Sequence, residues 1–183
     1  MNGSKLWTKN FIIDSTANFF IYLVYYTLTV IIAIYAMDTL QASPGTAGFA
    51  SGIFILTALF SRIFTGKTID QIGQKKMLFI GLGIYFSATF LYFSADNMPF
   101  LLIIRSLHGI GFGISATATG TIIAGIIPVQ RRGEGIGYYA MSVTLASAIG
   151  PFLGIYMNQH ISFNAIFGVC AAVLAVSFIA ALF

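Results

Sequence analysis

The sequence predicts an all-α membrane protein with six transmembrane helices, and three observations lead to that fold class. First, 58% of the 183 residues are hydrophobic and only 8% are charged, whereas a soluble domain carries about a quarter of charged residues. Second, uncharged runs recur with a length of about 20 residues, which is enough to cross roughly 30 Å of hydrocarbon. Third, runs such as FIYLVYYTLTVIIAIYAM lack the polar–apolar alternation of membrane β-barrel strands.

Six spans are predicted, and most of the short polar joints between them contain Pro or Gly, as helix ends should. Lys5 and Lys9 precede the first apolar run, as they would in a secretory signal. That run is too long for a signal and lacks a small-residue cleavage site, so we interpret it as a span. The predicted limits are about 15–37, 46–62, 77–95, 99–127, 135–157 and 162–183.

Lysine and arginine are distributed asymmetrically between the joints. They precede the first span and occupy the second and fourth joints, whereas the other joints contain none; the residues are Lys5, Lys9, Arg62, Lys67, Lys75, Lys76, Arg131 and Arg132. Basic residues stay on the cytoplasmic side of a membrane. We therefore expect a multi-pass plasma-membrane protein with both termini in the cytoplasm, and the net charge of +4 needs no nucleic-acid partner.

Enzymatic function, cofactors and metal sites are not expected. The sequence has no phosphate-binding loop, no nucleophile–base pair and no metal-ligand spacing. The single cysteine, Cys170, lies in an apolar run and is interpreted as a small apolar residue. GIGFG, at residues 109–113, does not follow a strand and is interpreted as a helix-packing surface rather than a nucleotide site.

Arg105 and His108 are the most informative residues of the fourth predicted span. A charge at a helix centre costs roughly 2.5–3.5 kcal/mol on insertion, so Arg105 either snorkels to the outer interface or faces the bundle interior. Gly109 and Gly113 share its helical face, which favours the interior. His108 can change charge near neutral pH, although a neutral, hydrogen-bonded core histidine is the more common case.

Asp14, at the start of the first predicted span, has two interpretations. It can cap the first helix, or it can point into the bundle as an acid that carries a proton. The aromatic residues that crowd the same span suit an apolar or aromatic solute if some of them line a cavity; they are Phe19, Phe20, Tyr22, Tyr25 and Tyr26.

The second joint, GKTIDQIGQKK, is expected to be a tight cytoplasmic loop. Gly66 and Gly73 would supply backbone freedom. Asp70 would accept hydrogen bonds from a helix N-terminus or pair with a nearby cation. The pattern Gly66, Asp70, Gly73, Lys75 resembles the signature joint between helices two and three of the major facilitator superfamily of secondary transporters.

Two further motifs resemble the same superfamily. In LLIIRSLHGIGFG, an arginine at Arg105 precedes a glycine at Gly109, although His108 stands where the superfamily commonly has glutamine. In ASAIGPFLG, residues Gly150, Pro151 and Gly154 match the superfamily's antiporter motif. The proline predicts a bend in this helix, and the glycines make a smooth face for close packing.

The resemblance implies one six-helix half of a transporter, built from two inverted three-helix repeats, with the solute bound between two such halves. It implies proton coupling at Arg105, a conformational switch at the second joint, and antiport. His108 and Asp14 are further candidates for proton coupling because of their own chemistry. The predicted function is the N-terminal half of a proton-coupled exporter of small amphipathic molecules. An uptake symporter, a truncated non-transporting fragment and an assembly partner are the alternatives.

The same resemblance implies a partner. The faces that carry Arg105, His108, Gly150 and Gly154 are expected to lack their usual neighbours in a single half. We therefore expect the chain to associate with a second six-helix half or with itself, because polar groups open to lipid are unfavourable.

Overall fold

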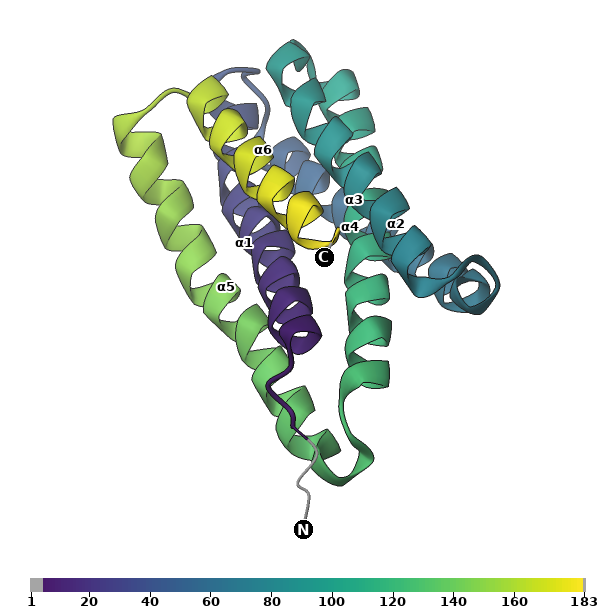
Figure 1. Ribbon diagram of the computed structural model, residues 1–183. Coiled ribbons are helices and arrows are strands. Elements are labelled where there is room, and N and C mark those ends of the chain that lie inside the picture. Colours follow the sequence, from purple (N-terminus) through teal and green to yellow (C-terminus); the bar gives the residue numbers. More distant parts are fainter. Residues whose placement is uncertain (1–4, 183) are drawn as a thin grey trace.

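The computed structural model describes residues 5–182, and within them the chain is helical without β-strands. Figure 1 shows the helices as a bundle in which successive helices run in opposite directions. Six helices are long and apolar enough to cross a membrane, which confirms the predicted fold class. The elements are α1 (Lys9–Asp38), α2 (Pro44–Ile72), α3 (Gln74–Leu91), η1 (Tyr92–Ser94), α4 (Met98–Ile126), η2 (Val129–Arg131), α5 (Arg132–His160) and α6 (Phe163–Ala180).

The helices do not coincide with the predicted spans. For example, α2 continues to Ile72, whereas the predicted second span ends at about residue 62. A helix can leave the hydrocarbon and continue through the head-group layer, so helix ends and membrane boundaries are different quantities. The limits of the spans therefore stay predictions.

Side-chain caps fix where four of the helices begin. Thr8, Ser43, Asn97 and Ser162 each accept a hydrogen bond from the backbone N–H three residues later, which satisfies one of the free donors of a helix N-terminus. Asp14 lies in the second turn of α1, so the interpretation of Asp14 as a helix cap is wrong.

The second joint is a single residue rather than a loop. The helix continues through Gly66 and Asp70 to Ile72, and α3 begins at Gln74. Gly73 alone leaves the helix, with φ of 95°, a value that only glycine adopts without strain. The expectation of a loop from residue 66 to residue 76 is therefore wrong, and Gly66 lies within a helix rather than in a turn.

Glycines on two sides of α4 allow it to pack closely against both α2 and α3. Gly109 and Gly113 lie against backbone atoms of α2, and Gly111 lies against the backbone of Tyr85 in α3. A side chain at any of these positions would collide with the neighbouring helix. The GIGFG stretch is therefore a helix-packing surface, as predicted.

The same kind of contact recurs between α5 and α1. Gly150 and Gly154 lie against the backbone around Thr27 of α1, and α5 packs along α1 as α2 packs along α4. The second helix of each three-helix unit thus packs on the first helix of the other unit. Two inverted three-helix repeats produce this pattern.

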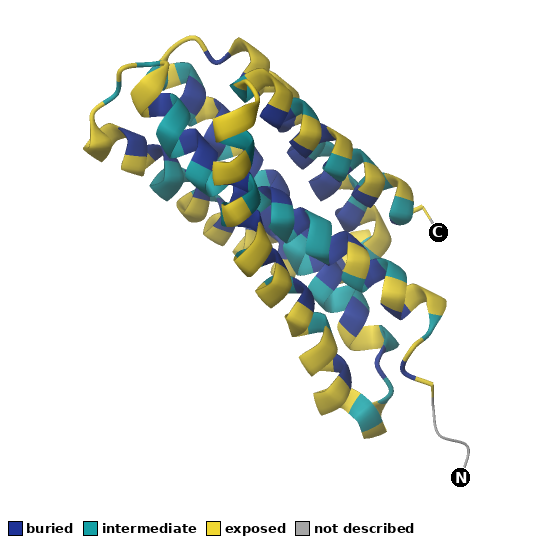
Figure 2. Cartoon of the chain, turned by 90° about the vertical axis from the view of Figure 1, so that its left-hand side faces the viewer, coloured by how far each residue is buried: buried dark blue, intermediate teal, exposed yellow. Residues whose placement is uncertain are grey.

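The outer faces of α2 and α5 carry large exposed apolar side chains, among them Phe60, Phe64 and Phe152. In Figure 2 exposed residues occupy the outward faces of the helices, while buried residues face the inside of the bundle. An apolar surface of this extent is normal only in contact with lipid or another protein, as expected for a membrane-spanning bundle.

Candidate functional site

Arg105 lies in the interior of the bundle. Its side chain is 1% exposed. Its Nε donates a hydrogen bond to the carbonyl of Ala50 in α2 (3.1 Å), and its Nη1 donates to the hydroxyl of Tyr92 (3.3 Å). The guanidinium also lies over the ring of Phe54, 4.2 Å from its centre. The snorkelling alternative is therefore wrong, because the side chain points between the helices.

Among residues 5–182, the acceptors that the positively charged Arg105 side chain meets are neutral. In the part of the chain that the structure describes, its Nη2 has no hydrogen-bond partner. The ion pair found among the described residues joins Arg131 and Glu134 at the start of α5 and does not involve Arg105. A buried charge without a carboxylate is costly, and a costly ionisable group inside a membrane bundle indicates a functional site.

A chain of hydrogen bonds continues from Arg105 to His108 and beyond. The Tyr92 hydroxyl lies 3.3 Å from Nδ1 of His108, and Nε2 of His108 lies 3.2 Å from the hydroxyl of Thr89. The Thr89 hydroxyl donates its hydrogen to the carbonyl of Tyr85 (2.9 Å). It can therefore only accept a hydrogen bond from Nε2 of His108. His108 therefore carries its hydrogen on Nε2 and accepts on Nδ1 from Tyr92.

A second polar network joins α1, α4 and α5. Asn18 is fully buried. Its amide nitrogen donates to the hydroxyl of Ser142 (2.9 Å), and its amide oxygen accepts from the hydroxyl of Thr119 (3.1 Å). Tyr139 donates to the same Thr119 hydroxyl (2.9 Å). Cross-helix hydrogen bonds of this kind are worth about 0.6–2 kcal/mol each in a membrane, so the network fixes the three helices relative to one another.

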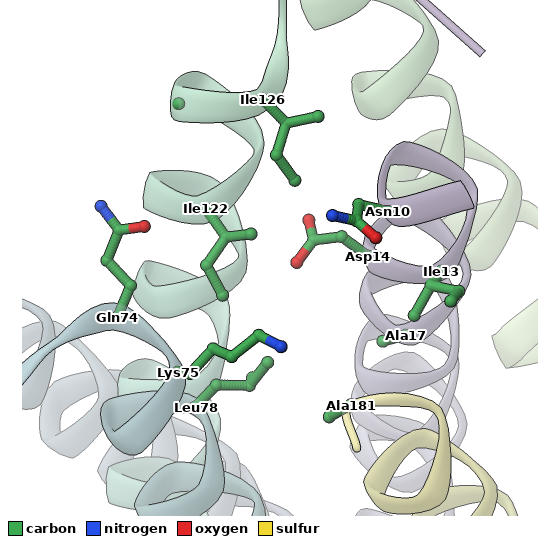
Figure 3. A pocket seen from close by; sticks show the side chains of 11 residues that line it. Asn10, Ile13, Asp14, Ala17, Gln74, Lys75, Leu78, Ile122, Ile126 and Ala181 are labelled. Carbon is green, nitrogen blue, oxygen red and sulfur yellow. The ribbon is translucent and has the colours of Figure 1, made fainter. Parts of the chain in front are cut away.

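Asp14 lies one turn before Asn18 and forms part of a cavity wall. Its side chain is 6% exposed, and Oδ2 has no hydrogen-bond partner among residues 5–182. The cavity measures about 360 Å³ and is lined by α1, α3, α4 and Ala181. Figure 3 shows the Asp14 carboxylate pointing into it, with Lys75 on the opposite wall. Asp14 thus faces the interior of the bundle, and its role in proton coupling stays a prediction.

An aromatic cavity of about 350 Å³ lies between α1, α2 and α4. Its walls include Tyr22, Tyr25, Phe54 and Phe112, and the rings of Tyr25 and Phe112 stack at 4.8 Å. Arg62 donates to the hydroxyl of Tyr22 (3.2 Å). Three of the aromatic residues singled out in the first span, Tyr22, Tyr25 and Tyr26, therefore line a cavity.

Three residues of the second joint, Asp70, Gly73 and Lys75, line one shallow pocket of about 550 Å³ at the joint between α2 and α3. Asp70 is an exposed residue in the last turn of α2, whereas Lys75 reaches the cavity that contains Asp14. Gly73 forms the turn between them. A conformational-switch role for Gly66, Asp70, Gly73 and Lys75 stays a prediction.

The motif in α5 is packed inside the six-helix bundle. Gly150 and Gly154 are buried, and Thr27 of α1 donates to the carbonyl of Gly150 (3.2 Å). The helix continues through Pro151 to His160. The expectation that Arg105, His108, Gly150 and Gly154 lack neighbours in a single half is wrong, because α1, α2, α3 and η1 supply those neighbours.

Residues 15–183 match the sequence model of the Major Facilitator Superfamily. The chain belongs to the Major Facilitator Superfamily. It is 28% identical over 145 residues to multidrug resistance protein 1 of Bacillus subtilis, in an alignment that covers 76% of this chain and 37% of that protein. It is 31% identical over 145 residues to multidrug resistance protein 3 of the same organism, covering 78% of this chain and 28% of that protein.

An archaeal relative supports the same assignment. An MFS-type transporter of Methanocaldococcus jannaschii is 34% identical over 124 residues, covering 68% of this chain and 32% of that protein. The chain thus spans about a third of the length of these relatives. Membership of this superfamily, together with six helices long and apolar enough to cross a membrane, supports a multi-pass membrane protein.

Several residues of the site carry no superfamily signature in the sequence. Tyr92 and Thr89 lie at the end of an apolar run and look like ordinary aromatic and small residues there. Thr119 and Ser142 are equally inconspicuous. Asn18, a polar amide in an apolar run, was a usable signal, because such a side chain must find a partner inside the bundle.

Proposed function

We propose that the chain is the N-terminal six-helix half of a proton-coupled exporter of small amphipathic molecules. The observation that carries this proposal is the buried chain from Arg105 through Tyr92 to His108, a charged and titratable network in the middle of an apolar bundle. A static bundle gains nothing from such a network, because apolar residues of similar size would pack as well or better.

The geometry suggests how a proton would change the network. A second proton on His108 turns Nδ1 into a donor aimed at the Tyr92 oxygen, which already accepts from Arg105. The hydroxyl hydrogen of Tyr92 then has no acceptor within this chain of bonds. Protonation of His108 therefore favours a different arrangement of Tyr92 and Arg105. Because Arg105 is hydrogen-bonded to Ala50 in α2, its rearrangement would also change the contact between α4 and α2.

The aromatic cavity supports an amphipathic or aromatic solute. Its walls combine the rings of Tyr25, Phe54 and Phe112 with the guanidinium of Arg62, so it offers stacking surfaces together with polar groups. Two of the relatives are named multidrug resistance proteins, which agrees with this class of solute. The glycine and proline residues of α5 resemble an antiporter motif, which favours export.

A dye-efflux assay tests the proposal. Solutes in this superfamily bind between two halves, so we expect the chain expressed alone to give no proton-dependent efflux of a fluorescent cationic dye from membrane vesicles. Co-expression with a matching second six-helix half should restore efflux, and an ionophore that collapses the pH gradient should abolish it. Dye accumulation driven by the gradient would instead indicate an uptake symporter. Robust efflux by a chain shown to be monomeric would overturn the assignment as a half.

The proposed orientation places both termini in the cytoplasm. On a Cys170→Ser background, we expect cysteines introduced at Gln41, Asn97 and Gln159 to react with a membrane-impermeant thiol reagent added outside intact cells. Cysteines at Gln71 and Gln130 should react only after the cells are opened, because the lysines and arginines hold those joints inside. Labelling with the reverse pattern would contradict the orientation.

A further inference from the structure

The aromatic cavity between α1, α2 and α4 carries its formal charge on one lining residue, Arg62. The Nη2 of Arg62 donates to the hydroxyl of Tyr22 (3.2 Å), and its Cζ lies 5.5 Å from the centre of the Phe112 ring. Among residues 5–182, the ion pair found joins Arg131 and Glu134 and does not involve Arg62. The guanidinium therefore borders the cavity with a charge that no carboxylate of the described chain neutralises.

A second guanidinium lies behind the same aromatic wall. Arg105 lies over the ring of Phe54, 4.2 Å from its centre, and Phe54 lines the cavity. The rings of Phe54 and Phe112 pack against each other with centres 5.4 Å apart. Two neighbouring rings of the wall thus already have a cation against them.

Carboxylates lie away from this cavity. Along α1, Asp14 comes eight residues before the lining residue Tyr22, about 12 Å along the helix axis. Along α2, Asp70 comes eight residues after Arg62, which is the same separation. The helix α4, Met98–Ile126, contains no acidic residue. The surroundings of the cavity are therefore electropositive, and the effect is strong because apolar helices lower the local dielectric.

We propose that this cavity binds an aromatic organic acid, with its carboxylate paired to Arg62 and its ring against Tyr25 and Phe112. A guanidinium matches a carboxylate with two parallel hydrogen bonds. The Tyr22 hydroxyl accepts from Arg62 and keeps its own hydrogen to donate to the same carboxylate. The inference names the class of solute at the cavity that the proposed function assigns to the solute, and it rests on that assignment.

The dimensions of the cavity suit a ligand of this kind. Its volume of about 350 Å³ lies within the range of small-molecule sites, about 300–1,000 Å³. The rings of Tyr25 and Phe112 are stacked at 4.8 Å, so their outer surfaces offer the offset or edge-to-face contacts that a third aromatic ring prefers.

An aromatic cage for a cation is the competing interpretation, because five rings line the cavity. Two of those rings, Phe54 and Phe112, already have a guanidinium against them, and a bound cation would be repelled by Arg62. A cationic dye can still bind through its rings, but an anionic compound of the same shape should bind more tightly. A metal ion is disfavoured as well, since the described residues contain no cluster of three or more His, Cys, Asp or Glu side chains.

Isothermal titration calorimetry of the purified chain in a maltoside detergent tests the charge preference. The probes share one aromatic skeleton and differ in charge: cinnamate is anionic, cinnamamide is neutral and cinnamylammonium is cationic. We expect cinnamate to bind about tenfold or more tightly than cinnamamide, the effect of a hydrogen bond between charged groups. Cinnamylammonium should bind most weakly, and acrylate, which has the carboxylate without the ring, should not bind measurably.

Four variants separate the contribution of the charge from that of the rings. Arg62→Gln removes the charge, so cinnamate should fall to the affinity of cinnamamide, whose own binding should change little. Arg62→Lys keeps the charge without the fork and should retain part of the preference. Arg132→Gln makes the first change at an exposed position outside the cavity and should leave all affinities unchanged. Tyr25→Leu removes a stacking ring and should weaken cinnamate and cinnamamide by a similar factor.

The proposal fails if the wild-type chain binds none of the probes, if it binds cinnamate no more tightly than cinnamamide, or if Arg62→Gln keeps the preference. It also fails if the preference disappears when a matching second half is co-purified, because Arg62 then pairs with that half. Each variant is compared only after it elutes with the wild-type profile in size-exclusion chromatography. Loss of dye efflux with the preference intact would contradict the proposed transport function, whereas normal efflux without the preference would contradict this site alone.

Discussion

Arg105→Ala is expected to reduce proton-driven transport by the complete assembly to background. The substitution removes the only charge in the buried chain formed with Tyr92 and His108, and it removes donors from the Ala50 carbonyl and the Tyr92 hydroxyl. Arg105→Lys should also impair transport. The planar guanidinium of Arg105 donates to two acceptors and stacks on Phe54 at the same time, and a single ammonium group cannot do so. The measurement is dye efflux from vesicles with an imposed pH gradient, at equal expression.

Two further variants separate coupling from folding. Arg132→Ala makes the same chemical change at an exposed position and should transport normally. Tyr92→Phe keeps the ring that stacks on Phe167 at 5.1 Å but removes the hydroxyl between Arg105 and His108. We expect it to fold normally and to lose much of the dependence of transport on the pH gradient. Normal transport by Arg105→Ala would show that the residue is structural and that coupling lies elsewhere.

The sequence was sufficient to predict the fold class and the interior position of Arg105. Uncharged runs of membrane length determine the number of helices, and the glycines on the face of Arg105 indicate where α4 packs. These inferences succeed because they depend on local spacing along one helix. The partners of Arg105 could not be predicted, since Ala50 and Tyr92 come from other helices and look ordinary in an apolar run.

The errors also have physical reasons. Gly66 and Asp70 are common in turns, yet α2 continues through both to Ile72, because one glycine in a long helix costs only about 1 kcal/mol. The faces with Gly150 and Gly154 were expected to need another half. In the structure α1 covers them, because α5 packs on the first helix of the other repeat. Sequence alone does not show which of two partner helices a smooth face meets.

Gly111→Ala is expected to destabilise the bundle by about 1–3 kcal/mol or more, the cost of overpacking a close contact. A Cβ atom at Gly111 would lie 2.7 Å from the Cα of Tyr85 and equally close to other atoms of that residue. Because these are mainly backbone atoms of α3, no side chain can rotate away, and α3 and α4 must separate. The separation would also disturb the stacking of Tyr85 on His108, whose ring centres are 4.2 Å apart.

The control is the same substitution in the same helix. At Gly120 a Cβ atom would approach nothing closer than the hydroxyl of Tyr139 at 4.0 Å. Gly120→Ala should therefore be neutral, or stabilising by about 0.5–1 kcal/mol, because alanine loses less backbone entropy in a helix than glycine. The measurement is the midpoint of thermal unfolding in detergent, followed by size-exclusion chromatography of heated samples. We expect Gly111→Ala to unfold several degrees below the wild type and Gly120→Ala at or above it. Equal midpoints for the two variants would show that α3 and α4 are farther apart than the structure places them.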